Sequence, residues 1–280
     1  MREISVDLIR DSVARLCQDA NILLPPDIQA ALREAVKQET SPAGLAVLED
    51  LLENAALAGK MHLPICQDTG MAVVFADIGQ EVHITGGWFE DAVRLGVADG
   101  YTSGYLRPSV VSDPLLRQNT GDNTPPVIHT RIVPGDQLHL TVAPKGFGSE
   151  NMSATRLLSP SEGRDGIRRF VLETVEKAGP NPCPPVVIGI GLGGTLEKAA
   201  LLAKQALLLP AQSVNEQAHL ADLERDLLQA VNRLGIGPGG LGGRVTALAL
   251  HILAWPTHIA GLPVVLNMSC HATRHAEATL

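Results

Sequence analysis

The chain has 280 residues, of which 45% are hydrophobic and 19% charged, a composition typical of a globular protein with a substantial core. Acidic residues outnumber basic ones by 30 to 22 and only 3% of residues are aromatic, so neither a basic face nor base-stacking aromatic residues for nucleic acid are expected. The sequence contains no run of about 18 apolar residues and no signal-peptide core at its N-terminus, and we expect a cytoplasmic protein without a membrane span.

The first 60 residues are predicted to be helical. Apolar residues recur at helical spacing over residues 5–58, with two breaks. Pro25-Pro26 separates the first helix from a second that begins at Asp27. Ser41-Pro42 opens a third helix, which Gly59 ends.

From residue 61 the sequence is rich in Gly, Pro and short β-type runs. Strands are predicted at 71–76, 81–85, 127–133, 137–144 and 186–190, and helices at 88–100, 149–158, 162–178, 195–209 and 216–234. A Gly-rich connection at 235–243 leads to apolar segments at 245–254 and 263–268. Strands and helices do not alternate regularly, so we expect an α+β fold. We expect one domain over 1–280, with a helical N-terminal part (1–60) followed by a mixed sheet and helix part (61–280).

Three of the four cysteines lie in loops next to predicted strands. Cys17 is the exception, because it continues the apolar face of the first helix and is expected in the core. Cys66, Cys183 and Cys270 are 117 and 87 residues apart and form no local C-x-x-C pair. They could be three unrelated thiols. They could also hold an iron–sulfur cluster, in which case three thiolates would leave one iron open to bind a substrate oxygen.

Polar residues near these cysteines could take part in catalysis. Asp68, two residues after Cys66, could transfer a proton or could simply form an Asx-turn. The loop Lys145 to Asn151 follows a strand and could either bind an anion at a helix start or form an ordinary capped turn. The stretch Asn119 to Pro126 could line a polar cavity or make a network of Asx-turns. Arg107 could clamp a carboxylate or form a surface ion pair.

Two other patterns are interpreted as false leads. Residues Gly189 to Gly194 match G-x-G-x-x-G, but no second strand ending in an acidic residue follows about 20 residues later. We interpret them as a tight backbone turn and not as an NAD site. His271 and His275 have H-x-x-x-H spacing but lack the Glu of a zinc-protease motif, so we do not interpret the pair as a zinc site.

Five motifs, in order along the chain, carry a resemblance to a known family. The sequence resembles the α subunit of the class I, iron–sulfur fumarate hydratase and L(+)-tartrate dehydratase family over about residues 5 to 275. The motifs are Ile65-Cys-Gln-Asp-Thr-Gly70, Asn119-Thr-Gly-Asp-Asn-Thr-Pro125, Lys145-Gly-Phe-Gly-Ser-Glu-Asn151, Cys183-Pro-Pro185 with Gly189 to Thr195, and Ser269-Cys-His-Ala272.

The resemblance implies a reversible hydro-lyase with a [4Fe–4S] cluster that has one open iron. Cys66, Cys183 and Cys270 would be the cluster ligands, and Asp68 would relay a proton. The residues implied to contact a small dicarboxylate substrate are Gln67, Asp68, Arg107, Gly146, Gly148 and Ser149. Single-chain family members have Gly at the position of Phe147, a difference we expect in two-subunit members.

The resemblance also implies a partner. Single-chain members continue into a second domain, so we expect a separate β subunit that carries the opposing base, a Thr, in an α2β2 assembly. Hydration of fumarate to L-malate is the leading prediction because fumarases are the more widespread members, with L(+)-tartrate or a related dicarboxylate as the alternative. The rival classes are a non-catalytic iron–sulfur protein, which would need Cys17 as a fourth ligand, and a nucleotide-binding oxidoreductase.

Overall fold

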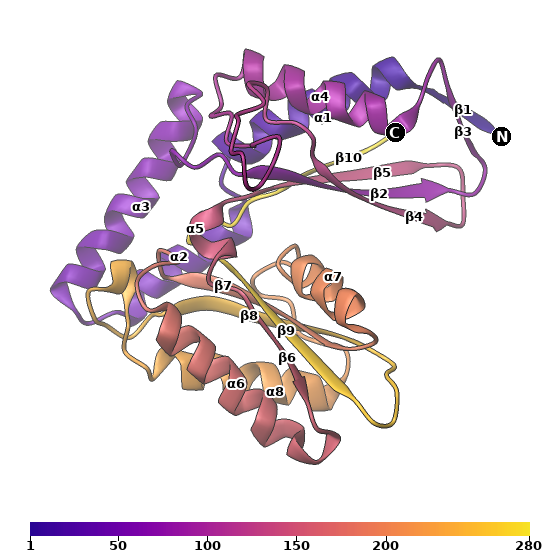
Figure 1. Ribbon diagram of the computed structural model, residues 1–280. Helices are drawn as coiled ribbons and strands as arrows, with labels where there is room; N and C mark the ends of the chain where they lie inside the picture. Colours follow the sequence, from indigo (N-terminus) through magenta and orange to yellow (C-terminus); the bar gives the residue numbers. More distant parts are fainter. The chain divides into compact units, whose positions relative to one another are not determined.

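The computed structural model describes residues 1–280 and divides into two compact units. The first unit contains residues 1–24, 57–147 and 274–280, and the second contains residues 25–56 and 148–273. Each unit combines helices with a mixed sheet, which confirms the predicted α+β class (Figure 1).

The first unit is built on a four-stranded sheet in the order β10-β5-β2-β4, in which only β2 and β4 are parallel. α1 and α4 pack against each other beside this sheet, and β1 pairs with β3 in a separate ribbon. The elements are β1 (Arg2–Ser5), α1 (Val6–Ile22), β2 (Met71–Gly79), β3 (Val82–Thr85), α4 (Phe89–Ser103), β4 (Val127–Val133), β5 (Leu138–Lys145) and β10 (Ala276–Thr279).

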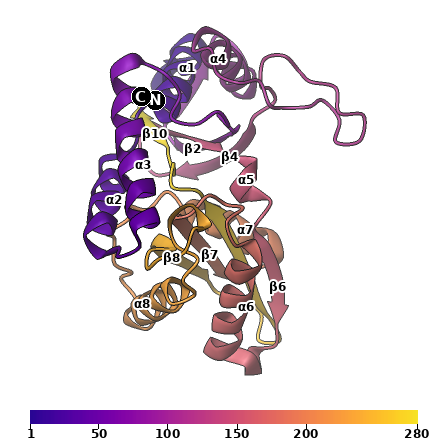
Figure 2. The same cartoon turned by 90° about the vertical axis from the view of Figure 1, so that its left-hand side faces the viewer.

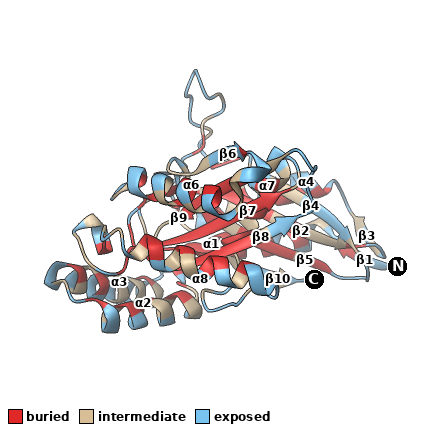
Figure 3. Ribbon diagram, turned by 90° about the horizontal axis from the view of Figure 1, so that it is seen from below, coloured by how far each residue is buried: buried red, intermediate tan, exposed pale blue.

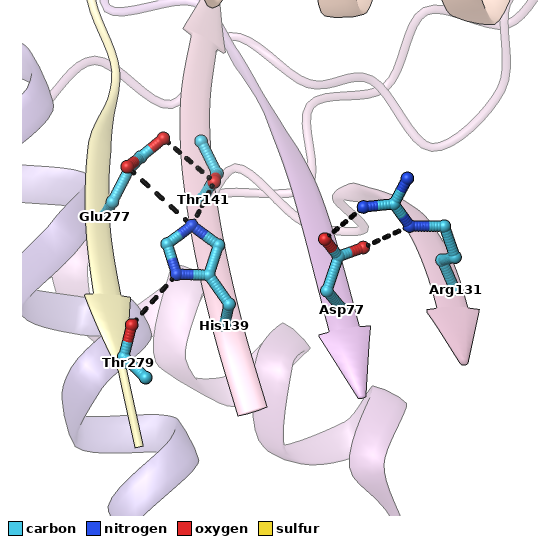
Figure 4. A network of polar contacts seen from close by, with 6 residues as sticks. All are labelled: Asp77, Arg131, His139, Thr141, Glu277 and Thr279. Carbon is cyan, nitrogen blue, oxygen red and sulfur yellow. Dashed lines mark hydrogen bonds and ion pairs between the residues drawn. The ribbon is translucent and has the colours of Figure 1, made fainter. Parts of the chain in front are cut away.

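Side-chain contacts fasten the edges of this sheet (Figure 4). His139 on β5 bonds through Nδ1 to the Thr279 hydroxyl at 3.0 Å, and the Thr141 hydroxyl donates to Glu277 at 3.3 Å. On the other side, the Arg131 guanidinium on β4 donates to the Asp77 carboxylate on β2, with 2.9 Å from Nε to Oδ1. The last residues of the chain are thereby held on the sheet.

The second unit has a four-stranded sheet in the order β6-β9-β7-β8, with β7 and β8 parallel. α7 covers one face and α6 and α8 cover the other (Figure 1). The elements are α2 (Pro26–Gln38), β6 (Ala154–Leu158), α6 (Gly163–Ala178), β7 (Val186–Gly193), α7 (Leu196–Ala206), α8 (Ala218–Asn232), β8 (Ala247–Trp255) and β9 (Leu262–Ser269), with two short 3-10 turns, η1 (Pro160–Glu162) and η2 (Pro238–Gly240). α3 (Pro42–Met61) and the one-turn α5 (Phe147–Glu150) each contribute residues to both units.

Burial follows the apolar pattern of the sequence. Buried residues gather on the strands of each sheet and on the inner sides of the helices (Figure 3). In the first unit, Ile9, Val13 and Cys17 of α1 have no exposed surface. The core of both units is aliphatic, because Val, Leu, Ile and Ala make up most of each cluster, in keeping with the low aromatic content.

The loop between α4 and β4 projects from the first unit (Figure 2). Its outer part exposes Leu115 and Leu116, whereas its ends carry Arg107 and the polar stretch 119–126. The ends of the loop return to the same place, so both polar segments lie at its base.

Several sequence predictions need correction. Residues 149–158 are not one helix, because α5 ends at Glu150 and Ala154–Leu158 forms strand β6, whose antiparallel pairing with β9 is non-local. Residues 189–193 are not a turn. They lie inside β7, where a Cβ at Gly189 or Gly191 would collide with backbone carbonyl groups of α7. Glycine is needed there because α7 packs directly on the strand. No helix has the combined length and apolarity needed to cross a membrane.

Candidate active site

The Cys66 turn is the centre of the candidate site in the first unit. It links α3 to β2, and it brings the thiol of Cys66 and the side chain of Asp68 to the same short segment. The backbone N–H of Asp68 donates to the Cys66 sulfur at 3.4 Å. Cys66 and Asp68 are half-buried and Gln67 is exposed. The turn therefore presents a sulfur, an amide and a carboxylate together.

Both carboxylate oxygens of Asp68 accept a backbone hydrogen bond. Oδ1 accepts from Gly70 N at 3.0 Å, which is the Asx-turn considered from the sequence. Oδ2 accepts from Phe147 N at 2.9 Å. A Cβ at Gly146 would lie 3.1 Å from the same Oδ2, so glycine lets the backbone of this loop come close to the carboxylate. The structure thus brings two of the sequence motifs, the Cys66 turn and the start of the Lys145 loop, into contact.

Two buried side chains fix the backbone of the Cys66 turn. The Tyr101 hydroxyl on α4 donates to the carbonyl oxygens of Thr69 at 2.7 Å and Gly70 at 3.2 Å. Burial raises the pKa of this phenol, so it remains a neutral donor. Arg274, four residues after Cys270, donates from Nη2 to the Asp68 carbonyl at 2.6 Å.

The loop that carries Arg107 is bound to the Cys66 turn through its backbone. Arg107 N donates to the Thr69 hydroxyl at 3.0 Å, and that hydroxyl donates to the Arg107 carbonyl at 3.1 Å. The Arg107 side chain is exposed. Its backbone is therefore fixed beside the turn while its guanidinium faces solvent, an arrangement open to an anionic ligand.

Asn123 accounts for much of the polar motif 119–125. This residue is completely buried, and its Oδ1 accepts from Ser109 N at 2.7 Å and Val110 N at 3.2 Å. Its Nδ2 donates to the Gly70 carbonyl at 3.0 Å. Asx-turns also form, with Gly121 N donating to Asn119. The motif is therefore a network of turns in which one buried amide joins the base of the Arg107 loop to the Cys66 turn.

In the second unit, Cys183 and Cys270 lie in neighbouring loops. Cys183 is exposed and has a left-handed backbone conformation, φ 55°, which is uncommon for a residue other than glycine. The carbonyl of Cys183 accepts from His271 N at 3.4 Å and lies 3.1 Å from Nδ1 of the His271 ring. Cys270 precedes His271, so the two thiol-bearing loops are joined at their backbones.

The Gly-rich segment 235–243, which we call the glycine collar, supports the Cys183 loop from behind. Gly239 N donates to the Pro184 carbonyl at 2.8 Å, and a Cβ at Gly240 would collide with Pro180. The sequence assigned no firm role to this segment. The structure places it as a close-packed support of the Cys183 loop.

Glu39 anchors the glycine collar. Its carboxylate is 5% exposed and accepts four backbone N–H groups, from Thr40 and Ser41 on one oxygen and from Arg244 and Val245 on the other, at 2.8–3.0 Å. Burial alone would raise the pKa of Glu39, but these four donors outweigh it and lower the pKa. A fixed buried anion therefore holds the collar.

The rest of the Lys145 loop belongs to the second unit. Gly148 is exposed and Ser149 is buried. Glu150 bonds to Lys204 of α7 at 2.7 Å and to the Asn267 amide at 2.8 Å, and Asn267 precedes Cys270 by three residues on β9. This segment is thereby bound to the strand that leads to Cys270.

Cys17 differs from the other three cysteines in its surroundings. It has no exposed surface, and burial raises the pKa of its thiol to about 12. It is a core residue, as its helical spacing predicts. Cys66, Cys183 and Cys270 lie in loops and form no disulfide, and the first belongs to the first unit and the other two to the second. Neither unit alone gathers three or more His, Cys, Asp or Glu side chains as a metal site.

Comparison with known proteins identifies the class. The sequence model of the fumarate hydratase (Fumerase) family matches residues 10–279, nearly the whole chain. The protein belongs to this family, and it is an enzyme of the hydro-lyase class.

Curated relatives align over almost their full length. The chain is 41% identical to a putative L(+)-tartrate dehydratase subunit alpha of Methanocaldococcus jannaschii, over 96% of each chain. It is 29% identical to the L(+)-tartrate dehydratase subunit alpha of Escherichia coli strain K12, over 98% of this chain and 93% of the relative. The resemblance stated from the five motifs is thereby confirmed.

Sequence reasoning missed the residues that hold the site in shape. Glu39, Tyr101 and Arg274 stand outside the five motifs. Their signals are faint, since Glu39 ends a helix before Ser41-Pro42 and Tyr101 looks like an ordinary apolar position of α4. Arg274 follows the last cysteine closely enough to have been a candidate.

Proposed function

We propose that this chain is the α subunit of a cytoplasmic, iron–sulfur-dependent hydro-lyase that removes water from a small hydroxy-dicarboxylate. The observation that carries the proposal is the position of the Asp68 carboxylate. Asp68 lies two residues after Cys66, and its carboxylate is fixed by the backbone N–H groups of Gly70 and Phe147. A carboxylate held in one orientation beside a potential metal ligand suits proton transfer at a defined place.

The donor set fits an iron–sulfur cluster. Cys66, Cys183 and Cys270 would hold it, since all three lie in loops, form no disulfide and keep some exposed surface, and thiolates are the usual ligands of such clusters. When bound, a cluster with only three thiolate ligands supplies a Lewis acid at its fourth iron. Cys17 is enclosed in the apolar core, which disfavours the rival in which a fourth thiol completes an electron-transfer centre.

The residues of the chain would then have separate roles in proton transfer and substrate binding. Asp68 would take up or release a proton at its carboxylate, and the Gly146 loop would limit where that carboxylate can move. Arg107, with its backbone fixed and its guanidinium exposed, would bind one substrate carboxylate bidentately. Gln67, Gly148 and Ser149 complete the proposed substrate contacts. Because negative charge builds up when a proton leaves carbon beside a carboxylate, the fixed positive groups would favour that step.

We place L(+)-tartrate first among the substrates and L-malate second. The relatives that align over the full chain carry the name L(+)-tartrate dehydratase, whereas the family carries the name fumarate hydratase. The preference for fumarate and malate rests on how widespread fumarases are, which is a weaker ground than the names of full-length relatives.

A separate β subunit is part of the proposal. The relatives are named as alpha subunits, which supports a second polypeptide, and the side chains described above include no clear opposing base for the far side of the substrate. We propose that β supplies this base, a Thr, and that two copies of each chain assemble as α2β2, since two-fold closure is common among soluble assemblies.

The test is an anaerobic assay of the α chain, alone and with its β partner, against L(+)-tartrate, L-malate and D-tartrate. We expect dehydration of L(+)-tartrate by the pair, weaker or no activity with D-tartrate, and none by α alone. Activity with malate but not tartrate would restore the sequence-based preference. Full activity of α alone would refute the role of β, and no dehydration of any hydroxy-dicarboxylate by the pair would refute the proposed function.

A further inference from the structure

Arg274 is a buried cation with hydrogen-bonding capacity that the protein leaves unused. The residue is 5% exposed, and its Nη2 donates to the Asp68 carbonyl at 2.6 Å. Its Nε and Nη1 are enclosed and have no hydrogen-bond partner. One bond is thus made by a group that can donate five.

This arrangement is costly. A guanidinium stays charged at all physiological pH values, and burying it costs several kcal/mol unless an anion compensates. Asp68 is the acid of the Cys66 turn, but its two carboxylate oxygens accept backbone N–H groups and it contacts Arg274 through its carbonyl oxygen, without an ion pair. Arg274 is also close enough to Tyr101 to pull the pKa of that phenol down, although burial dominates and raises it. Tyr101 gives its own proton to two carbonyls of the same turn, so it offers no negative charge.

The position of Arg274 indicates what the charge is for. It binds the backbone at Asp68, two residues from Cys66, and the N–H of the same residue donates to the Cys66 sulfur. The buried cation and the thiol are therefore linked through the backbone of a single residue, Asp68. A thiolate ligand and the cofactor it holds would add negative charge close to this cation, which has no ion pair with the Asp68 carboxylate of the same turn.

We propose that Arg274 is a positioning residue that clamps the Cys66 turn and supplies a fixed positive charge opposite the anionic cluster held there. The inference rests on the proposed function, because it needs the cluster. Its consequence is electrostatic, since a fixed positive charge stabilises the more negative, reduced state of the cluster and removal of that charge makes reduction harder.

A pair of substitutions separates the charge from the clamp. Arg274→Gln keeps a donor for the Asp68 carbonyl but removes the charge, and Arg274→Lys keeps the charge but removes the planar fork. Arg94→Gln is the matched control, because Arg94 is an exposed arginine of the first unit paired with Asp91. The α and β chains are purified together anaerobically for each variant. Iron per chain is then counted, and the reduction of the cluster is followed by electron paramagnetic resonance in a potential titration.

We expect Arg274→Gln to keep its iron but to lower the equilibrium constant for reduction of the cluster about tenfold. This makes the reduction potential more negative by about 59 mV for one electron. Arg274→Lys and Arg94→Gln should keep the wild-type potential. A wild-type potential in Arg274→Gln overturns the inference. Equal loss of iron or of folding in both Arg274 variants also overturns it, because the role would then be structural only. Absence of iron from the wild-type protein itself would instead refute the proposed function.

Discussion

The Cys66 turn and the Cys183 loop present the same kind of thiol by different means. Side chains hold the Cys66 turn, with Tyr101 and Arg274 on its carbonyl groups and Asn123 behind it. Backbone packing holds the Cys183 loop, through prolines, the glycine collar and the carbonyl contact to His271. The first thiol therefore depends on hydrogen bonds that single substitutions can remove, whereas the second depends on close packing and on one distant carboxylate, Glu39.

Replacement of the loop cysteines should have the largest effect. Cys66→Ser, Cys183→Ser and Cys270→Ser should each lose the iron and reduce dehydration by more than about 1000-fold, because a hydroxyl does not replace a thiolate ligand. Cys17→Ala is the control, and it should keep the iron and cost only about 1 kcal/mol of stability. Iron analysis and anaerobic assays measure both. A loop variant that keeps its iron and activity would remove that thiol from the comparison.

Asp68→Asn should lower turnover by roughly 100-fold, the usual scale for a positioned proton-transfer group. The change is nearly isosteric, so the cluster and the fold of the Cys66 turn should survive. Turnover is measured with saturating substrate beside iron content and thermal stability. Near-normal turnover with a full cluster would show that Asp68 is only the Asx-turn residue that its bond to Gly70 suggests.

Glu39→Gln should destabilise the glycine collar that supports the Cys183 loop. Loss of the anion that accepts four N–H groups should cost about 2–3 kcal/mol in the free energy of unfolding. Because the pKa of Glu39 is lowered from its usual 4.5, its stabilising effect is complete above pH 4.5 and is lost as the pH falls through the folded-state pKa. The difference between wild type and variant should therefore shrink on acidification.

Urea unfolding from pH 7 down to pH 3 measures that difference. Glu34→Gln on α2 is the control, since Glu34 is an exposed partner of Lys37 and its replacement should change stability little. A constant difference between wild type and Glu39→Gln at all pH values would show that the ionised carboxylate is not what holds the glycine collar.

Gly146→Ala should have the smallest effect. The added methyl group would lie 3.1 Å from Asp68 Oδ2, so the carboxylate must shift by a few tenths of an ångström. We expect turnover to fall on the order of 10-fold, less than the loss for an ångström of misplacement, with iron content unchanged. Gly121→Ala on the exposed part of the polar motif is no suitable control, because Gly121 has a left-handed φ. Ser109→Ala is better, since the bond to Asn123 comes from the backbone N–H of Ser109 and the hydroxyl makes only a long contact of 3.5 Å with the Arg107 carbonyl. Equal rates for Gly146→Ala and Ser109→Ala would contradict the proposed role of the contact.

The sequence predicted most local structure because helix spacing and turn residues act over a few positions. The three N-terminal helices and strands β2, β4, β5 and β7 occur close to where they are predicted. β6 and β10 do not follow from local patterns, because β6 pairs with β9 and β10 pairs with β5 across long stretches of sequence. The C-terminal segment is held on the sheet by this pairing of β10 with β5.

The same difference between local patterns and long-range contacts explains which residues of the candidate site could be predicted from the sequence. Motifs located the thiols, Asp68 and the loops around them, because glycines, prolines and polar turns are visible in short windows. Glu39 and Arg274 bind backbone groups 205 and 206 residues away, at Arg244 and Asp68. The place of Arg274 four residues after Cys270 could have made it a candidate, but neither residue's sequence neighbours identify its distant backbone partner, which the fold reveals.

Whether the three loop cysteines hold an iron–sulfur cluster is decided by counting iron and sulfide in the anaerobically purified protein. We predict a brown protein with about four iron and four sulfide per α chain, all retained in Cys17→Ala and lost in Cys183→Ser. A colourless protein that dehydrates its substrate with zinc in place of iron would contradict it.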